Sequence, residues 1–155
     1  MKTPELNIIL NKAETICARS GARLTEKRKR ILKLLLCSTV PLSAYDLADA
    51  YNNVSEASMP TMSVYRILDF LEAESLVHKL SSANKYIACS HIACEHDHEV
   101  PQFLICNRCQ NVREIAISKS IIDELGKQVS HAGYHLLNSQ LELQCLCRDC
   151  VEQAA

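Results

Sequence analysis

Two Cys-x-x-Cys pairs, far apart along the chain, constrain this protein more than any other feature of its sequence. The first pair lies in "FLICNRCQ" and the second in "CLCRDC". Two thiolates on one tight turn can bind the same metal ion, and four thiolates fill the tetrahedral shell of a structural zinc site. A site filled in this way has no open position for a substrate, so it stabilises a fold without catalysis. We therefore predict one structural zinc ion bound by Cys106, Cys109, Cys147 and Cys150.

The total of nine cysteines is odd, so they cannot all form disulfides within the chain. No apolar run approaches the roughly 18 residues of a membrane span. The N-terminus, "MKTPELNIIL", has neither the apolar core nor the cleavage site of a secretory signal. We therefore expect a cytoplasmic protein, and clustered cysteines in that reducing compartment bind metal more often than they form a disulfide framework, which is the alternative.

Positive charge is concentrated in one stretch of the first half of the chain, "RLTEKRKRILK". Residues 1–84 carry 11 Lys and Arg against 9 Asp and Glu, whereas residues 85–155 carry 6 against 9. Such a cluster is either a solvated helix face or a surface that contacts nucleic-acid phosphates. Composition leaves both interpretations open.

The first half of the chain has the element order of a winged helix-turn-helix. Apolar residues at helical spacing predict a helix over 4–19, and Thr25 and Ser43 are placed to cap two more. A fourth helix follows a polar loop, and "SLVHKL" and "KYIAC" then form a hairpin. We assign residues 1–84 to a DNA-binding domain whose fourth helix enters the major groove.

The second half predicts a smaller α/β domain over residues 85–155, in which two strands, "QFLIC" and "NVREIAI", flank the first cysteine pair. A helix runs from Ser118 to Gly133, and "YHLLNSQLELQCLC" alternates as a strand. The zinc ion would then join this last strand to the first two. The expected fold class is α+β, a winged-helix domain followed by a small α/β domain with a four-cysteine zinc site.

A second set of possible metal ligands is more dispersed. It comprises His78, Cys89, the run "CSHIACEHDHE" and Glu114. Imidazole, thiolate and carboxylate together suit zinc or a related divalent ion. The run offers more ligands than one site needs, so composition does not choose among them. A solvated polar loop with one buried cysteine is the alternative.

Several motifs together resemble the ferric uptake regulator family, and within it the zinc-sensing branch. They cover nearly the whole chain: "AETIC", "RLTEKR", "SAYDL", "SVYRILDFLEAESLVHK", "YIAC", "QFLICNRC" and "LCRDCVE". The resemblance implies a dimeric, zinc-responsive repressor of zinc uptake genes, with an N-terminal winged helix and a C-terminal dimerisation domain. It implies palindromic operator DNA and a second copy of the chain as partners, about two zinc ions per chain, and no enzymatic activity.

The resemblance also implies which residues form a regulatory zinc site. Residue by residue, they are His78 in "LVHK", Cys89 in "YIAC", His98 in "HDH" with His96 as its alternative, and Glu114 in "NVRE". A thiolate in such a site favours zinc over iron. These ligands come from both sides of the predicted domain boundary, so a metal bound by all of them would fix the angle between the domains. The family's further metal-binding histidine is replaced here by Asn138.

For DNA contact, the same resemblance implies Tyr65 and Arg66 on the fourth helix, and an arginine can bind a guanine edge with two hydrogen bonds. Ser63, Tyr45 and Arg28 are expected to contact phosphates, which position a protein without reading sequence. Packing in the core is the alternative role for Tyr65.

Three other functions compete with a zinc-responsive repressor. An iron- or peroxide-sensing member of the same family would need a different metal. A zinc hydrolase would need an open coordination position and a general base, which Glu114 could supply only if it were not a ligand. A zinc-stabilised protein-interaction module would have no affinity for DNA.

Overall fold

The structure is a computed structural model that describes residues 3–94 and 100–153. The chain separates into two compact units, Met1–Glu95 and His96–Ala155. This division differs from the predicted one between residues 84 and 85, because strand Lys85–Ala88 pairs with a strand of the first unit. Among the described residues, no helix is long and apolar enough to cross a membrane.

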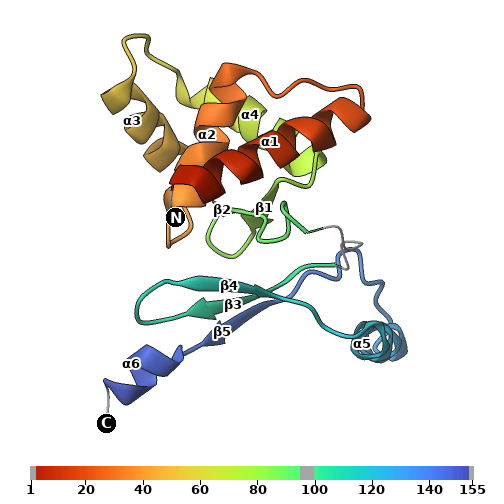
Figure 1. Ribbon diagram of the computed structural model, residues 1–155. Helices are drawn as coiled ribbons and strands as arrows, with labels where there is room; N and C mark the ends of the chain where they lie inside the picture. The colour runs from red at the N-terminus through yellow and green to blue at the C-terminus, as the bar shows by residue number, and fades with distance from the viewer. Residues whose placement is uncertain (1–2, 95–99, 154–155) are drawn as a thin grey trace. The chain divides into compact units, whose positions relative to one another are not determined.

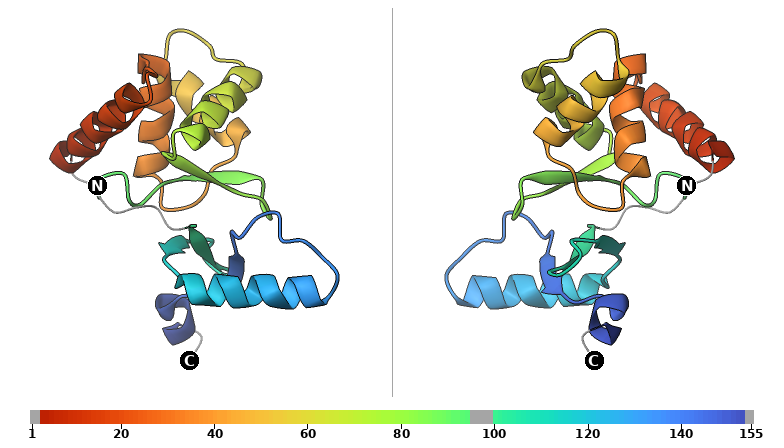
Figure 2. Two further views of the ribbon diagram at one scale, coloured as in Figure 1. Left: turned by 90° about the vertical axis from the view of Figure 1, so that its right-hand side faces the viewer. Right: turned by 90° about the vertical axis from the view of Figure 1, so that its left-hand side faces the viewer.

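The first unit is a bundle of four helices with a two-stranded hairpin at one end (Figures 1 and 2). The hairpin strands are antiparallel, and Val77 is opposite Ala88. This arrangement confirms the predicted winged helix-turn-helix. Its elements are α1 (Thr3–Arg19), α2 (Glu26–Cys37), α3 (Ala44–Val54), α4 (Thr61–Ala73), β1 (Val77–Leu80) and β2 (Lys85–Ala88).

Apolar residues at helical spacing form the core of this unit. From α2 and α4 they are Ile31, Leu32, Leu35, Val64, Leu68 and Leu71, all almost inaccessible to solvent. The hairpin is attached to this core through Tyr86, whose side chain is 1% exposed. Two backbone hydrogen bonds join Tyr86 to Leu42 ahead of α3, at 2.8 and 3.0 Å. The wing is therefore attached to the helices of this unit by both packing and backbone hydrogen bonds.

The two N-cap residues predicted from the sequence differ in whether their side chains form capping hydrogen bonds. Ser43 and Asp46 form the predicted capping box of α3: the Ser43 hydroxyl accepts from the Asp46 N–H at 3.1 Å, and the Asp46 carboxylate accepts from the Ser43 N–H at 2.8 Å. The Ser43 N–H and, at 2.7 Å, the Ser43 hydroxyl both donate to the Asp46 carboxylate, and these two hydrogen bonds lower the pKa of that carboxyl. Thr25 occupies the N-cap position of α2 in extended conformation, but its side chain makes no capping hydrogen bond.

We expect Ser43→Ala to destabilise the first unit by about 1 kcal/mol, because it removes a side-chain cap from α3. Urea denaturation measures this loss, and Thr25→Ala is the matched control with a smaller expected effect. The lowered pKa of Asp46 also contributes to the free energy of unfolding of this unit. This contribution is fully present above the pKa of the carboxyl in the unfolded chain, and it is lost as the pH falls through the lower pKa of the folded state. Equal losses from both substitutions would contradict the assigned caps.

The second unit is built on a three-stranded sheet of order β4-β3-β5. Strand β3 is central: it pairs antiparallel with β4 and parallel with β5. The sheet therefore joins the last strand to the first two, as predicted. The elements are β3 (Gln102–Cys106), β4 (Val112–Ile115), α5 (Lys119–His131), β5 (Glu142–Cys145) and α6 (Arg148–Glu152).

The last strand is much shorter than the predicted strand over 134–147. Leu137 is 98% exposed, so the alternation in this stretch does not mark a buried face. The fully buried Gln102 explains where pairing begins: its side chain donates to the Ser139 carbonyl at 2.9 Å and accepts from the Leu141 N–H. Residues 134–138 remain outside the sheet, and the short helix α6 was not predicted at all.

Candidate metal centre and nucleic-acid interface

The first cysteine pair lies on the tight turn between β3 and β4. Cys106 ends β3, and its carbonyl accepts from the Gln110 N–H while its N–H donates to the Asn111 carbonyl, both at 2.9 Å. Gln110 adopts the left-handed conformation, with φ 61°, which reverses the chain. Cys109 lies within the turn that these two hydrogen bonds close. The backbone of the turn, rather than side-chain packing, thus brings the first two sulfur atoms together.

The second pair is brought to the first by the parallel pairing of β5 with β3. Cys145, the last residue of β5, lies opposite Cys106, the last residue of β3. Cys147 follows two residues after the end of β5 and so comes close to the first cysteine pair. Cys147 is the N-cap residue of α6, and Cys150 lies within that helix. The Arg108 guanidinium donates to the Cys150 carbonyl at 3.0 Å and ties the turn to the helix.

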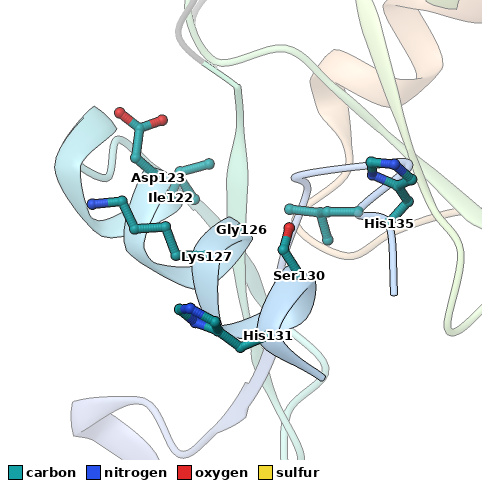
Figure 3. A pocket seen from close by; sticks show the side chains of 8 residues that line it. Ile122, Asp123, Gly126, Lys127, Ser130, His131 and His135 are labelled. Carbon is teal, nitrogen blue, oxygen red and sulfur yellow. The ribbon is translucent and has the colours of Figure 1, made fainter. Parts of the chain in front are cut away.

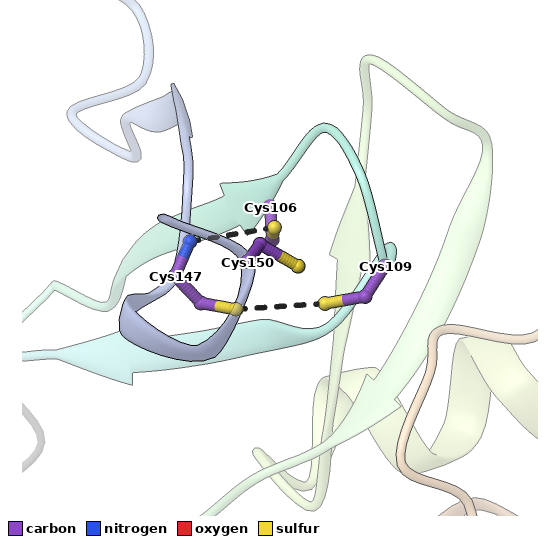
Figure 4. Close-up of side chains that lie close together, drawn as sticks. All are labelled: Cys106, Cys109, Cys147 and Cys150. Carbon is purple, nitrogen blue, oxygen red and sulfur yellow. Dashed lines mark hydrogen bonds between the residues drawn. The ribbon is translucent and has the colours of Figure 1, made fainter. Parts of the chain in front are cut away.

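The geometry of the four sulfur atoms fits a zinc ion. All four lie within 4.8 Å of one another, and they point into one small space (Figure 4). The Cys109 and Cys147 sulfur atoms are 3.7 Å apart. Four Zn–S bonds of about 2.3 Å in a tetrahedron place the sulfur atoms about 3.8 Å apart. The structure therefore brings the predicted structural ligands close enough together to bind one zinc ion: Cys106, Cys109, Cys147 and Cys150.

The thiol pKa values of this cluster are shifted in opposite directions. The backbone N–H of Cys109, and then that of Cys147, lower the pKa of the Cys106 thiol to about 6. Hydrogen bonding with the Cys147 side chain, and then burial, raise the pKa of the Cys150 thiol to about 12. Hydrogen bonds therefore favour the thiolate of Cys106, whereas hydrogen bonding and burial favour the protonated thiol of Cys150. A divalent cation allows all four to ionise, so we expect protons to compete with zinc as the pH falls.

Two of the predicted regulatory ligands meet within the first unit. His78 lies on β1, and Cys89 directly follows β2, so the hairpin pairing brings them to the same end of the wing. A ring nitrogen of His78 and the Cys89 sulfur lie within 4.8 Å of one another. Cys89 is only 2% exposed, and its N–H donates to the Leu76 carbonyl at 2.9 Å. The wing thus supplies an imidazole and a thiolate in position to share a metal ion.

The remaining predicted regulatory ligands belong to other segments of the chain. Glu114 is on β4 of the second unit, opposite Phe103 in the register, and its side chain is half-buried. His98 and its alternative His96 lie outside the described residues. The full predicted set therefore stays a proposal.

Helix α4 presents two opposite faces. Val64, Leu68 and Leu71 are buried, whereas Met62, Arg66 and Asp69 form an exposed stripe on the other side. Tyr65, between the two faces, is half-buried and packs against the core. Tyr45 on α3 is 65% exposed. Arg66 and Tyr45 are thus free to reach a bound partner, while Tyr65 also contributes to packing.

A basic groove lies where the first turns of α2 and α4 meet. Lys27, Arg28, Ser63 and Arg66 are among the residues that line it. The Arg28 guanidinium lies 3.5 Å from the centroid of the Phe70 ring and donates to the Arg23 carbonyl at 2.6 Å. Arg28 therefore braces α2 against α4 in addition to its predicted part in phosphate contact. Lys27 was not singled out from the sequence, since its charge is one of many in that run.

A broad groove of about 490 Å³ lies on the second unit between helix α5 and the segment that follows it (Figure 3). Ile122, Lys127 and His131 line it from the helix, and His135 and Leu136 line it from the segment that follows. No residue of α5 is buried. The predicted apolar face of this helix therefore has no counterpart within a single described chain. The large apolar residues that stay exposed in the described part of this unit are Val100, Ile121, Tyr134, Leu136, Leu137, Leu143, Leu146 and Val151.

Comparison with known proteins identifies one family. The ferric uptake regulator family matches residues 19–144. The zinc uptake regulation protein of Escherichia coli (strain K12) is 35% identical over 147 residues, which are 95% of this chain and 84% of that protein. Among solved structures, a zinc uptake regulator complexed with zinc and DNA matches with a TM-score of 0.84 at 32% identity, covering 100% of both chains. The crystal structure of holo XcZur matches with a TM-score of 0.76 at 33% identity, covering 92% of this chain and 96% of that one.

Proposed function

This chain belongs to the ferric uptake regulator family, and from that premise we propose that it is a zinc-responsive transcriptional repressor. It binds palindromic operator DNA as a homodimer when its regulatory zinc site is filled, and it controls genes of zinc uptake. The observation that carries this proposal is the similarity over the full chain to a zinc uptake regulator in complex with zinc and DNA. Such a regulator acts on the chromosome, so we place it in the cytoplasm.

The proposed DNA-binding surface is the exposed face of α4 with the basic groove beside it. Arg66 and Tyr65 are the proposed base contacts, since a recognition helix reads base edges from the major groove. Ser63, Tyr45 and Arg28 are the proposed phosphate contacts, and Ser63 and Arg28 both line the groove. The basic groove supports this assignment, because phosphate contacts require cations near the reading helix.

We expect Arg66→Ala to weaken operator binding by about 1–3 kcal/mol and to relax the sequence preference at one base pair, because it removes a bidentate hydrogen-bonded contact to guanine. Electrophoretic mobility shifts on the operator and on single-base variants measure both effects. Lys12→Ala, a loss of the same charge on α1, is the control and should leave the preference unchanged. A loss on random DNA equal to the loss on the operator would reassign Arg66 to the backbone.

The proposed dimer forms through the second unit. Its support is the exposed apolar surface of that unit and the absence of any buried residue in α5. Exposed apolar surface of this extent is typical of an interface. A symmetric pair of chains would also match the two halves of a palindrome, which lie one helical turn of DNA, about 34 Å, or a multiple of it apart.

The proposed regulatory ligands are His78, Cys89, His98 or His96, and Glu114. The pairing of His78 with Cys89 on the wing supports the first half of this set. The wing belongs to the first unit and Glu114 to the second, so a bound zinc ion would fix the angle between them. That angle sets the separation of the two α4 helices in the dimer. Zinc then increases DNA affinity only as far as it binds the DNA-competent geometry better than the open one.

Switching a population from 1:99 to 99:1 requires roughly a 10⁴-fold difference in zinc affinity between the two geometries, about 5.5 kcal/mol. A buried thiolate such as Cys89 suits this task, because its bond to zinc is strong and iron competes poorly for it. This ligand chemistry favours zinc sensing over the iron- and peroxide-sensing alternatives.

A hydrolase is the less favoured alternative. Regulators of this family act by binding DNA rather than by catalysis, and this chain is not an enzyme. The four-cysteine cluster has no open coordination position when its metal is bound. The proposal assigns Glu114 to the metal, so it cannot also serve as the base that activates a water molecule.

A further inference from the structure

Met62 is an exposed apolar residue in the first turn of α4. Its side chain is 67% exposed, among the most exposed of the large apolar residues in the described part of the first unit. A single exposed apolar side chain is ordinary on a protein surface and carries no argument alone. What distinguishes Met62 is its place on the helix that is proposed to read DNA.

Met62 and Arg66 lie on one stripe of this helix. They are four residues apart, so their side chains share a face, and the buried Val64 and Leu68 mark the opposite face. Residues at the N-terminal end of a recognition helix are those that contact base edges. A DNA groove that the Arg66 side chain enters therefore also faces the Met62 side chain.

The chemistry of the major groove specifies what Met62 can meet there. Hydrogen-bond donors and acceptors cover most base edges, and the apolar group among them is the C5-methyl of thymine. Methionine is unbranched and polarisable, so it adapts to an apolar partner of irregular shape. Four helical residues span about 6 Å along the axis. This rise corresponds to about two base-pair steps of 3.4 Å.

We infer that Met62 is a specificity-determining residue that packs on a thymine methyl group within about two base-pair steps of the guanine read by Arg66. This inference rests on the proposed function, because it takes α4 as the reading helix. It adds apolar readout of thymine to the hydrogen-bond readout of guanine.

The test removes the methyl group from DNA and the thioether from the protein. The operator is first selected from random duplex DNA with the wild-type protein and zinc. Each thymine of one half-site is then replaced in turn by deoxyuridine, which lacks only the methyl group. We expect one such replacement to weaken wild-type binding about fourfold, the effect of burying one methyl group. Met62→Ala should bind the thymine and deoxyuridine forms of that position equally, because the two changes remove the same contact.

Ile8→Ala is the matched control, because Ile8 is 64% exposed on α1 and lies outside the reading helix. It should keep the fourfold sensitivity of the wild type, and both variants should bind zinc as the wild type does. Undiminished sensitivity in Met62→Ala, or a wild type with no sensitive thymine near the guanine, would overturn the inference alone. Failure of the wild type to select any duplex with zinc would overturn the proposed function together with it.

Discussion

Cys106→Ser is expected to remove the structural zinc ion and, with it, the folded dimer. Serine cannot replace a thiolate in this shell, and Cys106 has the lowest thiol pKa resolved in the cluster. Structural zinc binding contributes roughly 10–16 kcal/mol to folding in small zinc domains. A whole domain is stable by only about 5–15 kcal/mol. The second unit, with its small sheet, should therefore unfold. Zinc per chain, circular dichroism and sedimentation measure the three losses.

Cys145→Ser provides the matched control. Cys145 is the register partner of Cys106 across β3 and β5, and it is not a member of the four-sulfur cluster. This variant should keep its zinc, its fold and its dimer. A Cys106→Ser protein that is folded and dimeric without the metal would show that the cluster is not a structural centre.

The second large effect is expected from Cys89→Ser. This protein should remain a folded dimer with the structural zinc ion, because Cys89 lies in the first unit, away from the four-cysteine cluster in the sequence. Its zinc content should fall from about two ions per chain to about one. Zinc-dependent operator affinity should fall by up to about 10⁴-fold, the preference needed for a near-complete switch. Mobility shifts at buffered free zinc measure this loss.

Cys37→Ser is the control for this experiment, because Cys37 is an exposed cysteine at the end of α2 and belongs to neither set of ligands. It should respond to zinc as the wild type does. If Cys89→Ser binds the operator with unchanged zinc dependence, the regulatory site does not contain this thiolate. A Glu114→Gln variant then tests whether the remaining ligands suffice.

The features that sequence alone predicted well are those determined by local chemistry. The capping box of Ser43 and Asp46 needs only two side chains three residues apart, and it is present. The four zinc ligands were predicted because Cys-x-x-Cys spacing defines a turn, and the structure brings the two turns together through β5. The winged helix followed from the order and spacing of its elements.

The features that sequence missed depend on contacts between distant residues. The short β5 begins where the side chain of Gln102 binds the backbone at 139–141, a contact without any local pattern. The brace between Arg28 and Phe70 joins residues of different helices. The choice between His96 and His98, which lie outside the described residues, does not follow from the spacing of the sequence alone.

Zinc affinity measured with and without operator DNA tests the central claim most directly. By linkage, if zinc tightens operator binding by some factor, the operator must tighten zinc binding by the same factor. The measurement is a chelator competition with the dimer that already holds its structural zinc, in the presence and absence of saturating operator. We predict equal factors in the two directions, approaching about 10⁴ for a near-complete switch. A zinc affinity that does not change when the operator binds would contradict the account.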